Sequence, residues 1–309
     1  MKKILAVLLL AVVAGAGALG WSMTAEVLPA DGDFAVRIPE ATPPPELKLA
    51  AILAGKMFSQ AAFAYRGGAL TEPRVFGMGG ILVTHPKGTL LFDAGFGKNV
   101  DQHFTTIPAL MQATSKYAKE TPVADQLRAA GIEPGKLMGV VLTHSHWDHV
   151  SGLEDMREAS VWVNQAELDF IHSGHPASAL AASFGDLKYH VYSFPDGPYL
   201  GFDSSYDVFK DGSVVLVPAP GHTPGSIIAF ITFVAGKRYA LVGDLVWQTE
   251  GVDIPAQRPW LSRRLVDWDD AQVRHWIVHM HRLEAAIPGL AIVPAHDRRV
   301  WESLPRLGT

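Results

Sequence analysis

The sequence predicts a layered α/β sandwich. Of its 309 residues 48% are apolar and 18% are charged, short apolar runs alternate with helix-like segments, and several of those runs end in His or Asp. This composition excludes an intrinsically disordered protein. Strands that alternate with helices form sheets whose faces are covered by helices. We therefore expect one large folded domain, over residues 46–309.

The first 25 residues have the pattern of a secretory leader. Two lysines precede an apolar run over residues 4–21 that becomes rich in Ala and Gly, with Ala14-Gly15-Ala16 as a candidate cleavage site. Residues 1–25 are predicted to be either a cleaved signal peptide or an uncleaved membrane anchor, which would be short for a hydrocarbon core of about 30 Å. In both cases we expect a periplasmic or secreted protein, held in the second case at the inner membrane.

Residues 26–45 are rich in Pro and Ala and are predicted to tether the leader to the domain. The whole chain has 26 basic and 31 acidic residues, a formal net charge of −5, so we expect no nucleic-acid partner. It contains no cysteine, which excludes disulfides, thiol nucleophiles and thiolate metal sites. A metal ion would therefore have to be bound by His, Asp or Glu.

The expected elements of the domain follow one another as strands and helices. Strands are predicted at 75–84, 89–92, 138–142, 161–163, 214–217, 227–234, 239–242 and 290–293. One helix should begin with Thr121 as N-cap and Pro122 at its first position and end before Gly131, and another should begin near residue 165. A third helix should run from Asp269, as N-cap, to about residue 287. Its core-facing positions keep a helical period: Val273, Trp276, Ile277, Met280, Leu283 and Ile287.

The densest functional signal follows the strand at 138–142. His144, His146, Asp148 and His149 lie within six residues. Such a group suffers desolvation and mutual repulsion without any benefit to the core. His144 and His146 are two residues apart and point the same way from an extended segment, while Asp148 and His149 come as the chain turns into a helix. This arrangement fits two adjacent metal ions.

Further candidate ligands follow other strands. His222 comes after the strand at 214–217, Asp244 after 239–242 and His296 after 290–293. Ligand sites of α/β folds lie at the carboxyl ends of strands, so these side chains are expected to meet the first group.

With these motifs the sequence resembles the metallo-β-lactamase superfamily of hydrolases, from about Arg74 to Trp301. The shared motifs, in family order, are Asp93-Ala94-Gly95, the HSHWDH run at 144–149, the GHTPG turn at 221–225, Gly243-Asp244 and Pro294-Ala295-His296. The resemblance implies a four-layer αββα sandwich. It also implies that one metal ion binds His144, His146 and His222, that a second binds Asp148, His149 and His296, that Asp244 bridges them, and that Asp93 orients a ligand histidine.

The nitrogen and oxygen ligands fit two Zn²⁺ ions, with Mn²⁺ or Fe²⁺ as alternatives. The expected nucleophile is a hydroxide between the metals, and Asp148 is the expected catalytic residue that carries a proton to the leaving group. The substrate is expected to be a small ester or lactone. A non-enzyme alternative is a metal-binding interaction module of the cell envelope. The sequence gives no indication of the oligomeric state.

Differences between this sequence and the patterns of particular subfamilies narrow the range of substrate classes. Penicillin-hydrolysing relatives usually lack an acid at the position of Asp244, which disfavours a β-lactamase. Lactonases of the family often carry Tyr three residues after that acid, where this chain has Trp247, so aryl-ester or phosphotriester hydrolysis stays open as an alternative. Trp247, Trp260 and Tyr206 are candidate walls of an apolar substrate pocket.

The remaining histidines are predicted to be structural. His275, His279 and His281 flank the apolar stripe of the last helix, and no acidic residue accompanies them as in an HExxH motif. His172 and His175 lie where Ser173-Gly174 and Pro176 indicate a loop, and contact with substrate is the alternative to a structural role for them.

Overall fold

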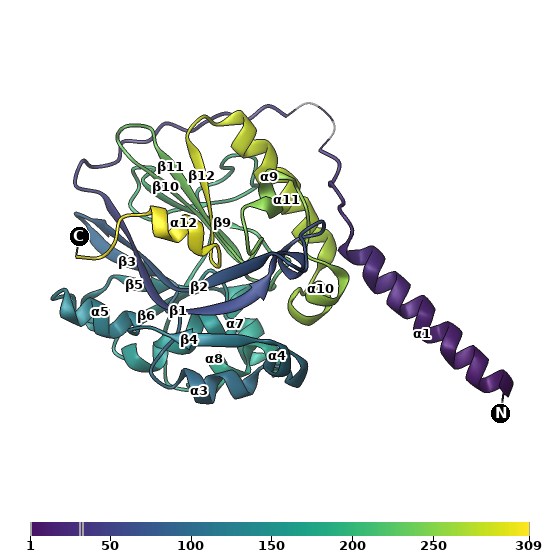
Figure 1. Cartoon of the computed structure of the whole chain (residues 1–309). Helices are drawn as coiled ribbons and strands as arrows, with labels where there is room; N and C mark the ends of the chain where they lie inside the picture. Colours follow the sequence, from purple (N-terminus) through teal and green to yellow (C-terminus); the bar gives the residue numbers. More distant parts are fainter. Residues whose placement is uncertain (1, 31, 33, 309) are drawn as a thin grey trace.

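Two β-sheets pack face to face and helices cover their outer faces in the computed structural model, which describes residues 2–30, 32 and 34–308 (Figure 1). The seven-stranded sheet has the order β4-β1-β2-β3-β5-β6-β7, and the five-stranded sheet has the order β12-β11-β10-β9-β8. The predicted αββα architecture is confirmed.

The strands of the first sheet are β1 (Lys48–Gln60), β2 (Pro73–His85), β3 (Gly88–Phe92), β4 (Lys116–Lys119), β5 (Gly139–Val141), β6 (Ser160–Asn164) and β7 (Lys188–Tyr192). Those of the second sheet are β8 (Tyr206–Asp207), β9 (Val214–Pro218), β10 (Ile227–Thr232), β11 (Arg238–Gly243) and β12 (Leu290–Pro294).

Helices lie on the outer side of each sheet (Figure 1). The helices on the side of the first sheet include α3 (Val100–His103), α4 (Ala109–Thr114), α5 (Val123–Ala129), α7 (Gln165–His172) and α8 (Ala179–Ser183). Those on the side of the second sheet include α9 (Glu250–Asp253), α10 (Trp260–Val266) and α11 (Asp270–Ala286). The remaining helices are α1 (Lys2–Met23), α2 (Ala61–Ala64), α6 (Trp147–Val150) and α12 (Arg298–Ser303), together with short 3₁₀ turns at Phe104–Thr106, Pro134–Lys136, Ser151–Met156 and Pro176–Ser178.

Alternating side chains create the layers. In β3, Leu90 and Phe92 pack between the two sheets, whereas Leu91 packs under the helices of the first sheet. The period of two in a strand requires this division, because neighbouring residues point to opposite faces. On the second sheet, Val273 and Ile277 of α11 pack against its outer face, as their helical spacing predicts.

Every strand predicted from the sequence is present, but β1, β4, β7 and β8 were not predicted. The sequence of β1 is rich in Ala, Leu, Lys and Met, which favour helices in isolation. Its pairing with β2 on one side and β4 on the other overrides this preference.

The two predicted helix caps have different outcomes. Asp269 caps α11 as predicted, because its side chain accepts hydrogen bonds from the backbone N–H groups of Ala271 and Gln272. The prediction for α5 is wrong: Pro122 is the N-cap, no side chain caps the helix, and Thr121 lies outside it. Pro122 has an extended ψ of 148°, so the helix starts one residue later than expected. Gly131, at φ 77°, follows its end.

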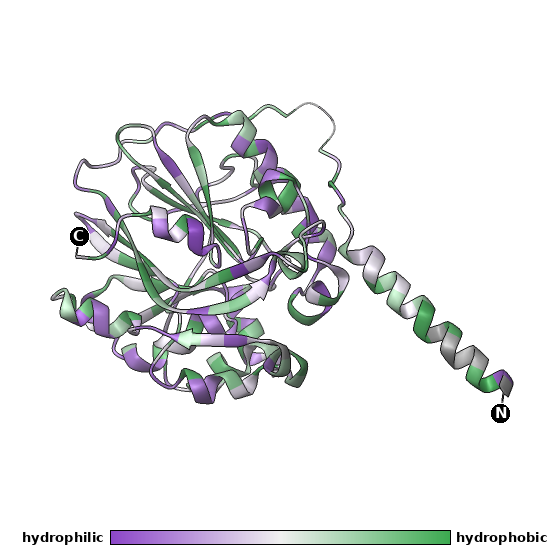
Figure 2. Ribbon diagram, in the orientation of Figure 1, coloured by the Kyte–Doolittle hydropathy of each residue, from purple (hydrophilic) through white to green (hydrophobic). Residues whose placement is uncertain are grey.

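The N-terminal helix α1 projects away from the domain (Figure 2). Its apolar side chains Ile4 and Leu5 are exposed. No helix in the described part of the chain is long and apolar enough to cross a membrane. Met1 of the predicted leader, Asp31 and Asp33 of the predicted tether and Thr309 of the predicted domain lie outside the described residues.

The segment predicted as a tether contacts the domain. Leu28 is buried among residues of the second sheet and α11, and its N–H donates to Pro255 O at 2.8 Å. Further along, Thr42 N donates to Asp211 O at 2.8 Å. At these two points the segment lies along the surface of the fold rather than free of it.

Candidate metal centre

Loops from both sheets bring the predicted ligands together. Asp93 follows β3, and the run from His144 to His149 follows β5 and enters α6. From the second sheet, His222, Asp244 and His296 follow β9, β11 and β12. All of these loops leave the carboxyl ends of their strands, where backbone N–H and C=O groups no longer pair within the sheet.

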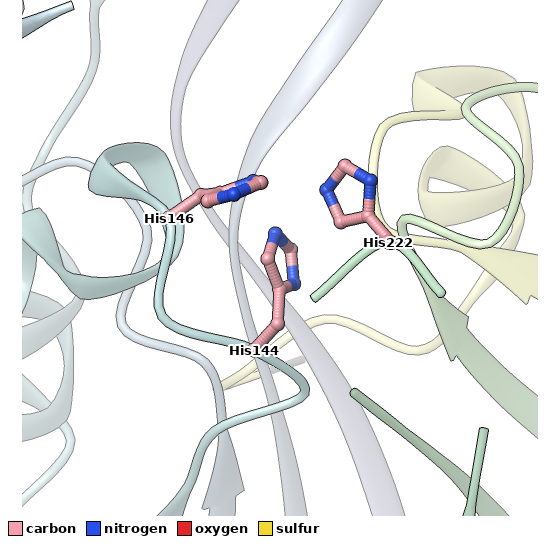
Figure 3. Close-up of side chains that lie close together, drawn as sticks. All are labelled: His144, His146 and His222. Carbon is pink, nitrogen blue, oxygen red and sulfur yellow. The ribbon is translucent and has the colours of Figure 1, made fainter. Parts of the chain in front are cut away.

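The first group of candidate ligands consists of His144, His146 and His222, whose rings turn toward one another (Figure 3). Their ring centroids lie 4.5–4.6 Å apart, and one ligand nitrogen of each lies within 4.8 Å of the others. Nε2 of His144 and Nε2 of His222 are buried and have no hydrogen-bond partner among the described residues. Burial and the neighbouring imidazoles lower the pKa of His144 and His146 well below the ordinary value. Neutral imidazoles with free lone pairs are the form that binds metal.

The second group consists of Asp148, His149 and His296. Nε2 of His296 lies 3.3 Å from Oδ2 of Asp148 and 3.3 Å from Nε2 of His149. Burial lowers the pKa of His149, but the carboxylates of Asp93 and Asp244 raise it more, to well above the ordinary value. For His296 too, burial lowers the pKa and Asp244 and Asp148 raise it by more.

Asp244 lies between the two groups. Its Oδ1 is 3.2 Å from His149 Nε2 and 3.0 Å from His296 Nε2, and its Oδ2 is 3.5 Å from His222 Nε2. Burial raises the pKa of Asp244, while His296 and His149 lower it by more, to well below the ordinary range. The carboxylate therefore presents one oxygen to each group, as the predicted bridging role requires.

This donor set fits divalent metal ions. Buried polar atoms normally have hydrogen-bond partners, yet Oδ1 of Asp244, like the two histidine nitrogens of the first group, has none with hydrogen-bond geometry among the described residues. Structural zinc sites are closed shells of four ligands. Here candidate ligand atoms from two groups lie around one carboxylate, which makes a larger set than a closed four-ligand shell contains.

Asp93 holds His149 in position. Oδ2 of Asp93 lies 2.9 Å from Nδ1 of His149 and accepts a hydrogen bond from Thr143 Oγ1 at 2.8 Å. Oδ1 of Asp93 accepts a hydrogen bond from Thr143 N at 2.7 Å. Asp93 has a φ of 59°, a left-handed conformation that is unfavourable for a residue with a Cβ and is retained where surrounding contacts impose it. These contacts are those that the predicted orienting role requires. His296 is held similarly, with Nδ1 at 2.9 Å from Gly77 O.

Sequence reasoning missed the pair that supports His222. Oδ1 of Asp267 lies 2.7 Å from Nδ1 of His222, and the same oxygen accepts a hydrogen bond from Arg258. Arg258 also donates to Asp244 O at 2.8 Å. Both side chains are buried. No motif marks them, because Asp267 and Arg258 lie 45 and 36 positions from His222 in the sequence.

Glu167 was also missed, although it joins two ligand loops. Its buried carboxylate accepts from Ser145 N at 2.6 Å, from Thr223 Oγ1 at 2.6 Å and from Gly225 N at 3.0 Å. The sequence Asn164-Gln165-Ala166-Glu167 has the spacing of a capping box, and Asn164 does cap α7. That local pattern accounts for Glu167 without indicating its longer-range role.

One of the three predicted pocket aromatics lies at the centre. Trp247 Nε1 donates to Asp244 Oδ2 at 2.8 Å, and the guanidinium of Arg258 lies 4.8 Å from the centroid of its ring. Tyr206 lies in β8 at the edge of the second sheet and stacks on Trp162, with ring centroids 6.5 Å apart, so its place in a substrate pocket stays a prediction. Trp260 begins α10, is 47% exposed and stacks on no other aromatic ring of the described residues.

Two histidines of α11 make structural contacts. Nε2 of His279 lies 2.8 Å from Leu200 O, and Nδ1 of His281 lies 2.9 Å from Val252 O. His172 ends α7, and His175 begins the turn that follows. The interpretation of the α11 histidines as flanking the apolar stripe thus agrees with their contacts.

Comparison with known proteins identifies the family. The family model of the metallo-beta-lactamase superfamily matches residues 80–296. The chain is 31% identical over 244 residues to the probable metallo-hydrolase Rv2300c of Mycobacterium tuberculosis, covering 72% of this chain and 75% of that protein. It is 27% identical over 231 residues to the N-acyl homoserine lactonase AttM of Agrobacterium fabrum, covering 73% of this chain and 83% of that protein.

Among solved structures, an N-acyl homoserine lactone hydrolase with its product N-hexanoyl-L-homoserine superposes with a TM-score of 0.68 at 16% identity, covering 87% of this chain and 99% of that one. AidC, a dizinc quorum-quenching lactonase, superposes with a TM-score of 0.52 at 16% identity, covering 84% and 90%. These similarities show the shared fold. The matched motifs and the geometry of their residues lead to one conclusion: the chain belongs to the metallo-beta-lactamase superfamily and is a metal-dependent hydrolase.

Proposed function

We propose that the protein is an exported hydrolase that uses two metal ions to open a lactone or to cleave a related ester. The observation that carries this proposal is the position of Asp244, whose Oδ1 faces His149 and His296 while its Oδ2 faces His222. A carboxylate shared in this way supports a pair of ions rather than one. We propose Zn²⁺ because imidazole nitrogens dominate the ligands, with Mn²⁺ or Fe²⁺ as alternatives.

Two bound ions would supply Lewis-acid polarisation of the ester carbonyl and activation of water. The protein's own side chains do the remaining work. The three histidines of the first group and the three residues of the second hold and orient the centre, and Asp93 and Asp267 fix the rings of His149 and His222. Asp148 is the catalytic residue that we propose for proton transfer: it accepts the proton that water loses as it adds to the carbonyl carbon, and it delivers this proton to the leaving oxygen as the C–O bond breaks.

The lactone assignment rests on the lactonases among the relatives. Trp247 supports the alternative, an aryl-ester or phosphotriester hydrolase, because its N–H is already bonded to Asp244 and is not free to donate to a substrate oxygen. A β-lactamase is disfavoured by the acid at Asp244.

The export proposal rests on the leader pattern of residues 1–25, with the apolar run at 4–21 as the anchor if the leader is retained. We expect a periplasmic or secreted protein. Fractionation of cells, followed by mass spectrometry of the N-terminal peptide, tests the location and the cleavage together. Recovery of the uncleaved chain in the cytosolic fraction would contradict the proposal.

Activity is tested by following proton release from four substrate classes: long-chain N-acyl homoserine lactones, aryl esters, phosphotriesters and cephalosporins. Each assay is run with the full chain, with and without a chelator. We expect chelator-sensitive turnover of the lactone to exceed that of the other classes. Preference for the aryl ester or phosphotriester would transfer the assignment to the alternative. Chelator-resistant turnover would contradict the metal-dependent mechanism.

A further inference from the structure

Three aromatic side chains form a cluster beside the first ligand group. They are Phe170 of α7, His175 of the turn that follows α7, and Trp268 of the segment between α10 and α11. We call this cluster the aromatic ridge. The first two are close in the chain, whereas Trp268 arrives from the other sheet's helices.

The rings of the aromatic ridge hold one another in place. The Trp268 ring is edge-on to Phe170, with centroids 5.7 Å apart at 75°, and edge-on to His175, at 5.7 Å and 72°. The Phe170 and His175 centroids are 5.2 Å apart. Nδ1 of His175 also accepts a hydrogen bond from Ala177 N at 3.2 Å, which fixes this ring relative to the backbone. Edge-to-face pairs of this kind are favourable and define ring orientation.

The aromatic ridge is joined directly to the candidate metal ligands. The ring of Phe170 lies 6.4 Å from that of His146, centroid to centroid. The backbone N–H of Trp268 donates to His222 O at 3.1 Å. A substrate whose carbonyl reaches the first ligand group would therefore have its substituents within reach of the ridge.

Trp268 is exposed and yet rigidly placed. Its side chain is 57% exposed, whereas Phe170 is buried. On one side of it, Asp267 is bonded to His222, and on the other, Asp269 N donates to Gly221 O at 2.8 Å while the Asp269 side chain caps α11. These bonds hold the backbone on both sides of Trp268, and the edge-on contacts with Phe170 and His175 orient its ring. Such preorganised aromatic surface binds ligands at a low entropic cost.

We propose that the aromatic ridge is the subsite for the apolar acyl group of the substrate, with Trp268 as the residue that sets the preference for long acyl chains. This inference rests on the proposed function, since it concerns the acyl side of the same ester or lactone. The rings of Phe170 and Trp268 are apolar, and no carboxylate lies among the three rings, which suits methylene groups.

Trp260 provides a matched comparison. It is 47% exposed, close to the value for Trp268, and lies eight positions earlier in the chain, but it contacts none of the ridge rings in the described part of the structure. If the exposure of a tryptophan alone determined chain preference, both residues would matter. The geometry assigns the role to Trp268.

The test measures kcat and KM for matched four-carbon and ten-carbon acyl substrates, both as homoserine lactones and as nitrophenyl esters. In Trp268→Ala we expect kcat/KM for the long chain to fall on the order of tenfold, mainly through KM, and that for the short chain by less than about twofold. Metal content should not change. Trp268→Phe should restore most of the preference, and Trp260→Ala should leave it intact. An unchanged chain-length ratio in Trp268→Ala, or its loss in Trp260→Ala instead, would overturn the proposal.

The experiments distinguish an incorrect proposed function from an incorrect assignment of the aromatic ridge. If the unmodified protein hydrolyses neither series, the ester or lactone assignment fails, and calorimetric binding of decanoate and butyrate then tests the ridge. Stronger binding of decanoate that is lost in Trp268→Ala supports the subsite. Equal binding of the two acids, or a preference that survives in Trp268→Ala, contradicts it.

Discussion

The two groups of candidate ligands contain similar donors but lie in different electrostatic surroundings. In the first group, burial and neighbouring imidazoles keep His144 and His146 neutral. In the second group, carboxylates raise the pKa of His149 and His296 above the ordinary value. In the first group His144 and His146 are therefore already in the neutral form that binds metal, whereas in the second group a metal ion must displace protons from the histidines. The same fold therefore gives its two groups of candidate ligands opposite shifts in histidine pKa.

The carboxylates that orient a histidine of each group also differ in their surroundings. His222 of the first group is backed by Asp267, which is itself paired with the buried Arg258. His149 of the second group is backed by Asp93, which is otherwise bonded only to neutral groups of Thr143. Removing the first carboxylate leaves a buried cation unpaired, but removing the second does not.

The largest effect is expected at the residue that the two groups share. Asp244→Asn keeps the shape of the side chain but removes its charge between the groups. We expect kcat/KM to fall on the order of a thousandfold or more, with loss of metal from both groups. Steady-state kinetics and elemental analysis of the purified variant measure both quantities. Retention of two ions and near-normal turnover would show that Asp244 does not connect the groups.

A large effect on stability is expected from Asp267→Asn. The substitution leaves the Arg258 charge buried without its partner, which typically destabilises a fold by about 3–5 kcal/mol. The free energy of unfolding, measured with the metals removed, should fall accordingly. The double variant Asp267→Asn, Arg258→Met should recover part of the loss. No recovery would contradict the buried-pair explanation.

Asp93→Asn is expected to affect metal binding more than folding. It removes the charge beside Nδ1 of His149 but leaves an amide oxygen that can still accept from Thr143 N. Loss of such a supporting carboxylate typically lowers metal affinity by about 10–100-fold. In a chelator titration the second group should lose its ion at lower chelator concentration, while the first group is unchanged. Equal weakening of both groups would argue that they are not electrostatically distinct.

The smallest of the expected effects is a difference in the pH at which the two groups lose their metal. The pKa of His149 and of His296 is raised, so protons compete with metal there already as the pH falls toward 6.5. The pKa of His144 and His146 is lowered, so the first group keeps its neutral form to lower pH. Metal content after equilibration at successive pH values should therefore fall in two steps. Simultaneous loss of both ions in one step would contradict this order.

The grouping of the candidate ligands and the layering were predictable from the sequence because both depend on local patterns. The run from His144 to His149 is contiguous, and His222, Asp244 and His296 each follow an apolar strand. The core face of α11 follows from helical spacing alone. These features need no knowledge of which segments pair in space.

The supports of the site were not predictable because they depend on contacts between distant segments. Asp267 lies 45 positions from His222, and Glu167 joins the loops of Ser145 and Thr223. Strand β1 was missed for a similar reason, since pairing on both edges determines its conformation.

The central claim is that two metal ions, held by two distinct groups and bridged by Asp244, are needed for hydrolysis. The most direct measurement reconstitutes the metal-free protein with increasing Zn²⁺ and follows bound metal and turnover together. We predict two ions per chain, with most of the activity appearing as the second ion binds. Full activity with one ion per chain, or activity that persists without metal, would contradict the account.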